Sequence, residues 1–156
     1  NWALKAQQLL NKDFKIAADV WSVTSWNELR RDGLAVDRHN LLNPGKPIKA
    51  FVTKQLKRRK GPVIAVSDFM RAVQDQVSPW VEQPFYSLGT DGFGLSDTRG
   101  ALRRHFKVDA ESIAVAALSQ LEKAGVINKR KVKKAIKKYQ INDVTAADAG
   151  NTEGSG

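Results

Sequence analysis

The chain has no cysteine among its 156 residues, which excludes disulfides, thiolate metal sites and a cysteine nucleophile. This composition is typical of a reducing compartment. Long apolar runs are also missing, since none approaches the roughly 18 residues of a membrane span, and residues 1–7 have neither the basic start nor the apolar stretch of a signal peptide. We therefore expect a cytoplasmic protein without a membrane partner. The chain length and the 42% of apolar residues are sufficient for one soluble domain with a hydrophobic core.

Histidine is scarce, because only His39 and His105 are present. Each has basic neighbours, which disfavour the protonated imidazole without creating a general base, so we interpret both as surface or packing residues. Two Ser-Asp pairs stand at 67–68 and 96–97. Without a histidine placed between their members, these pairs are better interpreted as helix caps than as activated serines. The sequence therefore predicts no catalytic, cofactor-binding or metal-binding residue in this chain.

Acidic residues are few: 16 Asp and Glu stand against 26 Lys and Arg, which gives a formal net charge of +10 and a pI near 10.0. Such a balance often marks nucleic-acid binding. Much of the excess lies in two clusters, residues 54–60 and residues 129–138. Neither interleaved aromatic residues nor zinc-finger spacing nor an RNA-binding signature accompanies them, which disfavours nucleic acid as a partner.

The second basic cluster surrounds an apolar stripe at helical spacing, formed by Val132, Ala135, Ile136 and Tyr139. This pattern favours a packed helix whose lysines form its solvated side. The same residues leave open an alternative function, a stand-alone basic module that binds nucleic acid or an acidic protein surface. The candidate basic docking face consists of Lys129, Arg130, Lys133, Lys134 and Lys137.

A strand-loop-helix junction follows the apolar strand expected at Phe85–Leu88, and its loop over residues 89–98 is here called the glycine loop. The glycines permit backbone conformations that a Cβ forbids, and Ser96 or Asp97 can cap the helix. A dinucleotide or phosphate loop is disfavoured, because position 97 lacks the glycine of G-x-G-x-x-G and no lysine completes a P-loop. We interpret the junction as a tight turn that directs a helix back onto the sheet. Its glycines are Gly89, Gly92 and Gly94.

Three segments with strand composition alternate with helical patterns: residues 16–23, interpreted as a strand buried on both faces, Val63–Val66 and Phe85–Leu88. This alternation predicts an α/β domain with three α/β/α layers and a mainly parallel, mixed sheet. The opening helix has no strand leading into it, so we expect a first strand just upstream of residue 1. The inner face of that helix consists of Trp2, Ala6, Leu9 and Leu10.

Residues that typically cap or end helices indicate further helices. Ser25-Trp26-Asn27-Glu28 forms a capping box for a short helix that ends by Gly33. Three helices follow the glycine loop, and Asp109 and Asn128 cap the second and the third. The domain is expected to occupy residues 1–142. The small, polar residues at 143–156 predict a disordered tail.

Three segments carry long motifs of defined residues. They read Ala18-Asp19-Val20-Trp21-Ser22-Val23-Thr24-Ser25 with Glu28-Leu29-Arg30-Arg31-Asp32-Gly33, then Val66-Ser67-Asp68-Phe69-Met70-Arg71, then Leu88-Gly89-Thr90-Asp91-Gly92-Phe93-Gly94 with Ser96-Asp97-Thr98-Arg99. With these residues the chain resembles the C-terminal domain of the homodimeric bacterial pyruvate dehydrogenase first component, up to about Ile141. The long glycine-loop motif is specific, whereas the shorter Phe93-Gly94-x-Ser96 pattern is shared with transketolase C-terminal domains.

The resemblance implies a thiamine-diphosphate- and magnesium-dependent enzyme that decarboxylates pyruvate and passes the acetyl group to a lipoyl arm of dihydrolipoyl acetyltransferase. It also implies that two earlier domains bind the cofactor and the metal, so that this chain supports the homodimer without catalytic residues of its own. The sequence agrees: Thr90-Asp91-Gly92 lacks the first glycine of a Gly-Asp-Gly thiamine motif, and residues 117–121 contain no asparagine. We therefore do not expect Asp91 to bind metal.

The candidate interface combines the glycine loop with large aromatic residues. It would pack on the dimer partner or on the preceding domains of the same polypeptide, since large aromatic side chains are common interface anchors. Trp21 is a further candidate, for which burial in the core is an equal alternative. The candidate interface residues are Asp91, Gly92, Phe93, Gly94, Ser96, Asp97, Trp26 and Trp80.

Overall fold

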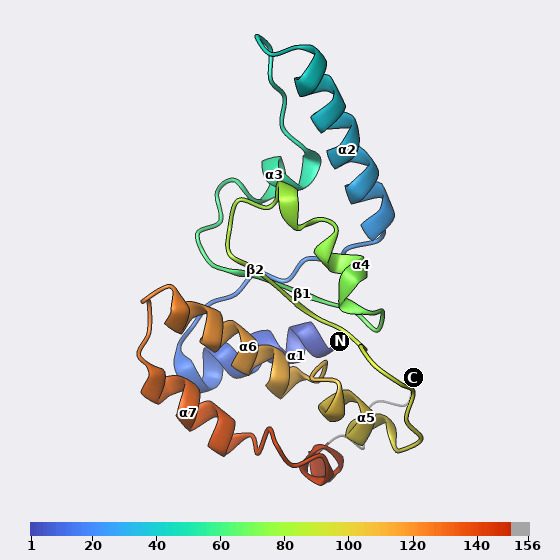
Figure 1. Ribbon diagram of the computed structural model, residues 1–156. Helices are drawn as coiled ribbons and strands as arrows, with labels where there is room; N and C mark the ends of the chain where they lie inside the picture. The colour runs from blue at the N-terminus through green and yellow to red at the C-terminus, as the bar shows by residue number, and fades with distance from the viewer. Residues whose placement is uncertain (151–156) are drawn as a thin grey trace.

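Two parallel strands, β1 (Val63–Val66) and β2 (Phe85–Leu88), lie between two groups of helices (Figure 1). The computed structural model describes residues 1–150, with side chains as far as residue 147. On one side of the strands lie α2, α3 and α4, and on the other lie α1, α5, α6 and α7 (Figure 1). The expected α/β fold class is confirmed. The helices are α1 (Trp2–Phe14), α2 (Trp26–Leu42), α3 (Phe51–Leu56), α4 (Arg71–Asp75), α5 (Arg99–His105), α6 (Ala110–Lys123) and α7 (Lys129–Lys138), with 3-10 helices η1 (Ser78–Trp80) and η2 (Thr145–Gly150).

The hydrophobic core lies where α1 and α7 pack on α6 beneath the sheet. Ala114 and Leu118 of α6 are completely buried, as is Ala135 of α7. From α1, Ala6 and Leu10 point into this core; they stand four positions apart, which places them on one helix face. The expected inner face of the opening helix is therefore confirmed. Several contact positions of this core are alanines: Ala6, Ala110, Ala114, Ala116 and Ala135.

The segment expected to form a strand at residues 16–23 has no regular secondary structure and belongs to no sheet. Among the described residues, residues 17–24 make no backbone–backbone hydrogen bond, and Trp21 is 47% exposed. Trp21 instead lies against the guanidinium of Arg59, 5.7 Å from the ring centroid, while Arg59 pairs with Asp19 over 3.0 Å. The expected buried strand is therefore wrong. Its β-branched composition favours extended backbone, but a strand also needs a neighbour to take its hydrogen bonds. The first strand upstream of residue 1 stays a prediction.

The helix expected to end by Gly33 continues as α2 to Leu42. Its start is confirmed, because Ser25 Oγ accepts a hydrogen bond from Glu28 N over 3.2 Å. Gly33 is not a stop: a Cβ there would lie 2.2 Å from a ring carbon of Trp80. The glycine thus serves contact with a distant aromatic ring, and the sequence alone does not show that contact.

Caps at the later helices are mostly where the sequence predicts them. Asp109 accepts from Ser112 N over 3.1 Å at the start of α6, and Asn128 accepts from Lys131 N over 3.3 Å at the start of α7. At α5 the cap is Thr98. The expected capping of α5 by Ser96 or Asp97 is corrected, because the strand-to-helix loop extends further before the helix begins.

Part of the expected disordered tail has regular structure. Thr145–Gly150 forms η2, which contacts α5, and Ala147 is only 3% exposed. The expectation of a structureless tail is therefore wrong at this 3-10 helix, where the small size of alanine permits packing. Residues 151–156, the rest of that tail, lie outside the described residues, and the expected domain over 1–142 stays a prediction.

Candidate functional site

Hydrogen bonds join the loops that follow β1 and β2. Thr90 N donates to Phe69 O over 3.0 Å, and Thr90 Oγ1 donates to Asp68 O over 2.7 Å. From α4, Gln74 Nε2 donates to Leu88 O over 3.0 Å. Parallel strands bring their carboxyl ends to one edge of the sheet, where open α/β sheets commonly bind partners or ligands. The start of the glycine loop is thus held against the loop after β1.

Gly89 lies where these two loops come closest. A Cβ at this position would lie 2.4 Å from Phe69 O and 2.9 Å from Arg71 N, so a larger residue requires the backbone to shift. Gly92 has a φ of +102°, which residues with a Cβ rarely adopt. At Gly94 a Cβ would meet open space. The expected need for glycine is confirmed at Gly89 and Gly92 but not at Gly94.

Asp91 caps α4 from across the two loops. Its Oδ1 accepts a hydrogen bond from Arg71 N over 2.9 Å, while Met70, at the N-cap position of α4, makes no side-chain cap. This carboxylate therefore satisfies one of the free amides at a helix start. Within residues 1–150 no group of three or more His, Cys, Asp or Glu side chains is placed to hold a metal ion.

Exposed apolar side chains gather on the same two loops. Phe93 is 95% exposed, and Leu95, Phe69 and Met70 each have more than half of their surface exposed. We call these four residues the loop-end patch. Such a set of large exposed side chains is typical of a surface that another protein covers. Gly94, Ser96 and Asp97 lie beside them and are also exposed.

Trp80 contacts other residues of this chain. Its ring packs on Gly33, and its Nε1 donates to Asp37 Oδ1 over 3.0 Å. Thr53 Oγ1 donates to the backbone oxygen of Trp80, which adds α3 to the same junction. The half-buried Trp80 thus fastens α2 and α3 together, while Trp26, also half-buried, begins α2. An interface role for these two tryptophans stays a prediction.

The helix α2 and its return segment, residues 26–51, project from the rest of the molecule (Figure 1). We call this feature the α2 arm. Asn40 joins α2 to the return segment, since the Asn40 side chain donates to Ile48 O over 3.0 Å and accepts from Ile48 N over 2.8 Å. Of the α2 residues only Gly33 and Val36 are buried. Large apolar side chains remain exposed along the arm: Leu34, Leu41, Leu42, Ile48 and Phe51.

Sequence reasoning missed the α2 arm because Gly33 was interpreted as the end of the helix. A signal was present, since Leu29, Gly33, Val36 and Asn40 follow one another at intervals of three or four residues, which is helical spacing. The exposure of the remaining leucines is a tertiary property and has no signal in the chain itself.

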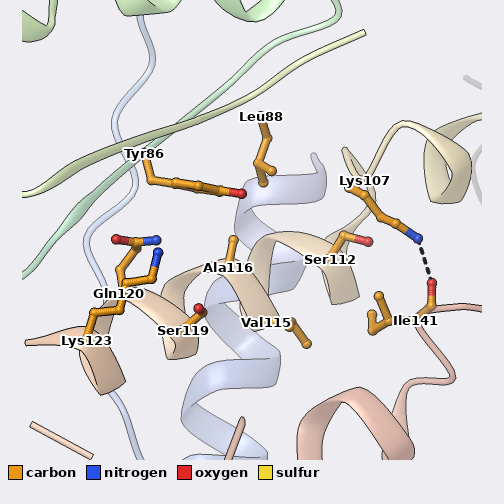
Figure 2. A pocket seen from close by; sticks show the side chains of 10 residues that line it. All are labelled: Tyr86, Leu88, Lys107, Ser112, Val115, Ala116, Ser119, Gln120, Lys123 and Ile141. Carbon is orange, nitrogen blue, oxygen red and sulfur yellow. Dashed lines mark hydrogen bonds between the residues drawn. The ribbon is translucent and has the colours of Figure 1, made fainter. Parts of the chain in front are cut away.

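A depression of about 220 Å³ lies between β2 and α6 (Figure 2). Lys107 Nζ at one end donates to Ile141 O over 2.8 Å, and burial is the main cause that lowers the pKa of this amine. Tyr86, Ser112 and Ser119 bring hydroxyl groups to the lining, which includes no His, Asp or Glu. The depression therefore offers no imidazole or carboxylate as a general base.

The candidate basic docking face is exposed on α7. All five predicted residues have exposed side chains, and none of them forms an ion pair with another described residue. Lys138, at the end of the same helix, does pair with Asp13 over 2.6 Å. On the opposite side Ala135 is buried and Tyr139 packs on the core, but Ile136 is 36% exposed. The apolar stripe is therefore narrower than the sequence predicts.

Both histidines make packing contacts. His105 stacks edge-to-face on Phe106 with ring centroids 4.9 Å apart. His39 Nε2 lies 3.2 Å from Lys46 O in the α2 arm. Their surroundings agree with the interpretation as surface or packing residues.

Comparisons with known proteins identify the relatives of this chain. The family model described as transketolase-like TK C-terminal domain matches residues 1–109. The chain is 52% identical over 146 residues to the pyruvate dehydrogenase E1 component of Mycolicibacterium smegmatis, covering 93% of this chain and 16% of the relative. The proteins of the same name from Mycobacterium tuberculosis and Escherichia coli are 50% and 42% identical over 97% and 88% of this chain, and the chain spans 16% of each.

These relatives carry the name that the sequence resemblance predicts, so the resemblance is confirmed. No helix within residues 1–150 combines the length and apolar character that crossing a bilayer demands. Because the family model covers more than half of its residues, the chain belongs to the family of transketolase-like TK C-terminal domains.

Proposed function

We propose that this chain is a supporting domain of a homodimeric pyruvate dehydrogenase E1 enzyme. The observation that carries the proposal is the identity of 52% over 93% of the chain with a protein of that name, of which the chain spans 16%. The whole enzyme would decarboxylate pyruvate with thiamine diphosphate and magnesium, and would reductively acetylate the lipoyl group of dihydrolipoyl acetyltransferase. We assign this enzyme to the cytoplasm.

The catalytic centre of the enzyme would lie outside this chain. The described residues do not fit the cofactor. Asp91 is the acidic residue of the glycine loop that stands where a thiamine motif has its aspartate, and its carboxylate already accepts a hydrogen bond from the backbone amide of Arg71. The described part of the chain also offers no cluster of acidic or histidine ligands for magnesium. These observations support our proposal that this chain contributes structure to the enzyme and that the earlier domains supply the residues of the reaction.

The supporting role would be performed by the α2 arm and the loop-end patch. Leu41 and Leu42 near the tip of α2 are 80% and 68% exposed, and Phe93 is almost fully exposed. Apolar side chains at such positions lose contact with water when a second protein surface covers them, which stabilises the assembly. We therefore propose that both surfaces pack against the rest of the E1 dimer.

The test uses the full-length enzyme with Phe93→Ala and, separately, Leu41→Ala, each examined by sedimentation velocity over a dilution series. Each change is expected to raise the dimer dissociation constant at least about fivefold, since truncation of a main anchor at an interface costs more than about 1 kcal/mol. Leu4→Ala is the matched control, because Leu4 is exposed on α1 and lies outside both surfaces. Dissociation constants that match the wild-type value in both variants would contradict the supporting role.

A further inference from the structure

We propose that α7 presents a docking surface for an acidic helical segment of a partner protein. The surface consists of Arg130, Lys133, Lys134 and Lys137 and is called the basic stripe. Intervals of three and four residues place these side chains on one face of the helix, over a length of about 10 Å. Val132, Ala135 and Tyr139 occupy the opposite face and pack on the core. The stripe therefore points away from the domain.

The charge of the stripe is not compensated within the described chain. Of the seven basic residues among the ten of α7, only Lys138 forms an ion pair with another described residue. Like charges at intervals of three and four residues destabilise a helix. A helix face that only kept the protein soluble would be more stable if it carried both acidic and basic residues. Because this face carries basic residues alone, its charge indicates an external partner.

The position of the charges along α7 strengthens this argument. The first turn contains no acidic residue and carries Lys129, Arg130 and Lys131. These cations face the positive end of the helix dipole, where acidic residues are the stabilising ones. Packing of Ala135 and Tyr139 on the core keeps the helix formed in spite of this cost. Helix stability therefore does not account for the basic first turn, whereas binding of an anion does.

The surroundings of the stripe favour a protein over a nucleic acid. Stacking platforms for bases need exposed aromatic rings, but Tyr139, at the C-terminal end of α7, stacks on Phe14 and donates to Asp13. Exposed aliphatic side chains flank the stripe instead: Ile136 is 36% exposed and Val126, in the turn before α7, is 67% exposed. An acidic helix with carboxylates at the same intervals and apolar residues beside them complements both features.

Membrane binding and self-association fit less well. An interfacial membrane helix needs a free apolar face, and the apolar face of α7 is used in the core. Self-association through α7 would bring the basic stripes of two copies into contact, and their like charges would repel. The proposal is independent of the function proposed above, because it follows from the charge and packing of α7 alone.

The test measures binding of a synthetic probe to the full-length protein that contains this chain. The probe is a helical peptide of about 20 residues with glutamates at intervals of three and four and leucines beside them. Fluorescence anisotropy at low and at physiological salt gives its dissociation constant. Binding of duplex DNA of about 20 base pairs is measured in the same way, to test nucleic acid as the alternative ligand.

The decisive variant combines Arg130→Glu, Lys133→Glu and Lys137→Glu. The matched control combines Lys57→Glu, Arg58→Glu and Lys60→Glu, which changes the net charge equally at exposed residues of the other basic cluster. We expect the α7 variant to weaken peptide binding at least tenfold and the control less than twofold. Circular dichroism checks that α7 persists, and a second α7 variant with glutamine at the same positions replaces the first if helix content falls.

Three results would overturn the proposal. The first is no peptide binding by the wild-type protein at low salt. The second is equal weakening by the α7 variant and the control, which would show an effect of net charge only. The third is tighter binding of duplex DNA than of peptide, with loss of DNA binding in the α7 variant, which would make the stripe a nucleic-acid surface.

Discussion

Arg104 joins three helices through one buried guanidinium group, with only 2% of the residue exposed. Its Nε donates to Asp109 Oδ2 at the start of α6, and its Nη1 donates to the carbonyls of Tyr139 and Gln140 over 2.8 and 3.2 Å. Glu111 lies 3.4 Å from Nη2. Arginine suits this site because its planar group has donors for all of these acceptors at once.

Arg104→Met is expected to lower the free energy of unfolding by about 3–5 kcal/mol, because it leaves the buried carboxylate of Asp109 without its cation. Denaturant titration measures the change. Arg31→Met removes an exposed pair with Glu28, where both side chains are more than half exposed, and is expected to cost under about 1 kcal/mol. Equal losses in the two variants would show that the buried pair has no special role.

Gly89→Ala is expected to lower the free energy of unfolding by about 1–3 kcal/mol, because the added Cβ would overlap the carbonyl oxygen of Phe69 and force the two loops apart. Gly45→Ala is the control, since a Cβ at Gly45 meets nothing within 4 Å. Thermal unfolding followed by circular dichroism compares the two variants. A melting temperature for Gly89→Ala as high as that of the control would contradict the close approach.

Among the structural elements, those defined by short-range patterns were predicted well from the sequence. Val63–Val66 and Phe85–Leu88 are strands because apolar, mostly β-branched or aromatic residues stand between turn signals. Asp109 and Asn128 begin helices because their side chains bond amides three residues ahead.

Elements that depend on distant contacts were predicted less well. Gly33 in the middle of α2 packs against Trp80, which lies 47 positions further along the chain, and no local pattern shows that pairing. For residues 16–23, composition indicates extended backbone but cannot supply the neighbouring strand. The same limit applies to the candidate site: the motif singles out Phe93, whereas its exposure and the α2 arm follow from tertiary structure.

The helices α1 and α7 are joined at Asp13. Tyr139 Oη donates to Asp13 Oδ2, and Lys138 Nζ lies against Asp13 Oδ1, both over 2.6 Å. The hydrogen bond from Lys138, followed by that from Tyr139, lowers the pKa of Asp13 below its ordinary value of 3.8. Burial, with the hydrogen bond to Asp13 next, raises the pKa of Tyr139.

Asp13→Asn tests this junction through pH. Because the folded-state pKa of Asp13 lies below the unfolded value of 3.8, its carboxylate stabilises the protein above that pH, and the stabilisation is lost as pH falls through the folded pKa. The difference in unfolding free energy between wild type and Asp13→Asn is therefore expected to be full near neutral pH and to shrink at acidic pH. Asp68→Asn, at an exposed side chain, serves as the control. A difference that stays constant down to strongly acidic pH would contradict the account.

At the scale of the whole molecule, two kinds of surface remain uncovered. The α2 arm, which projects beyond the strands (Figure 1), and the loop-end patch expose large apolar side chains, while the basic stripe of α7 exposes positive charge. The apolar surfaces suit permanent contact with the rest of an enzyme. The basic stripe suits a partner whose binding weakens as the salt concentration rises. Together they describe a domain that acts through contacts.

The most direct test of this account is the mass of the native polypeptide that carries the sequence. Antibodies against the domain would capture it from its source cells, and denaturing mass analysis would give its size. A mass several-fold above 17.3 kDa, together with pyruvate-decarboxylating activity in the captured material, is the predicted result, since the chain spans 16% of its E1 relatives. A polypeptide of 17.3 kDa without that activity would contradict the account.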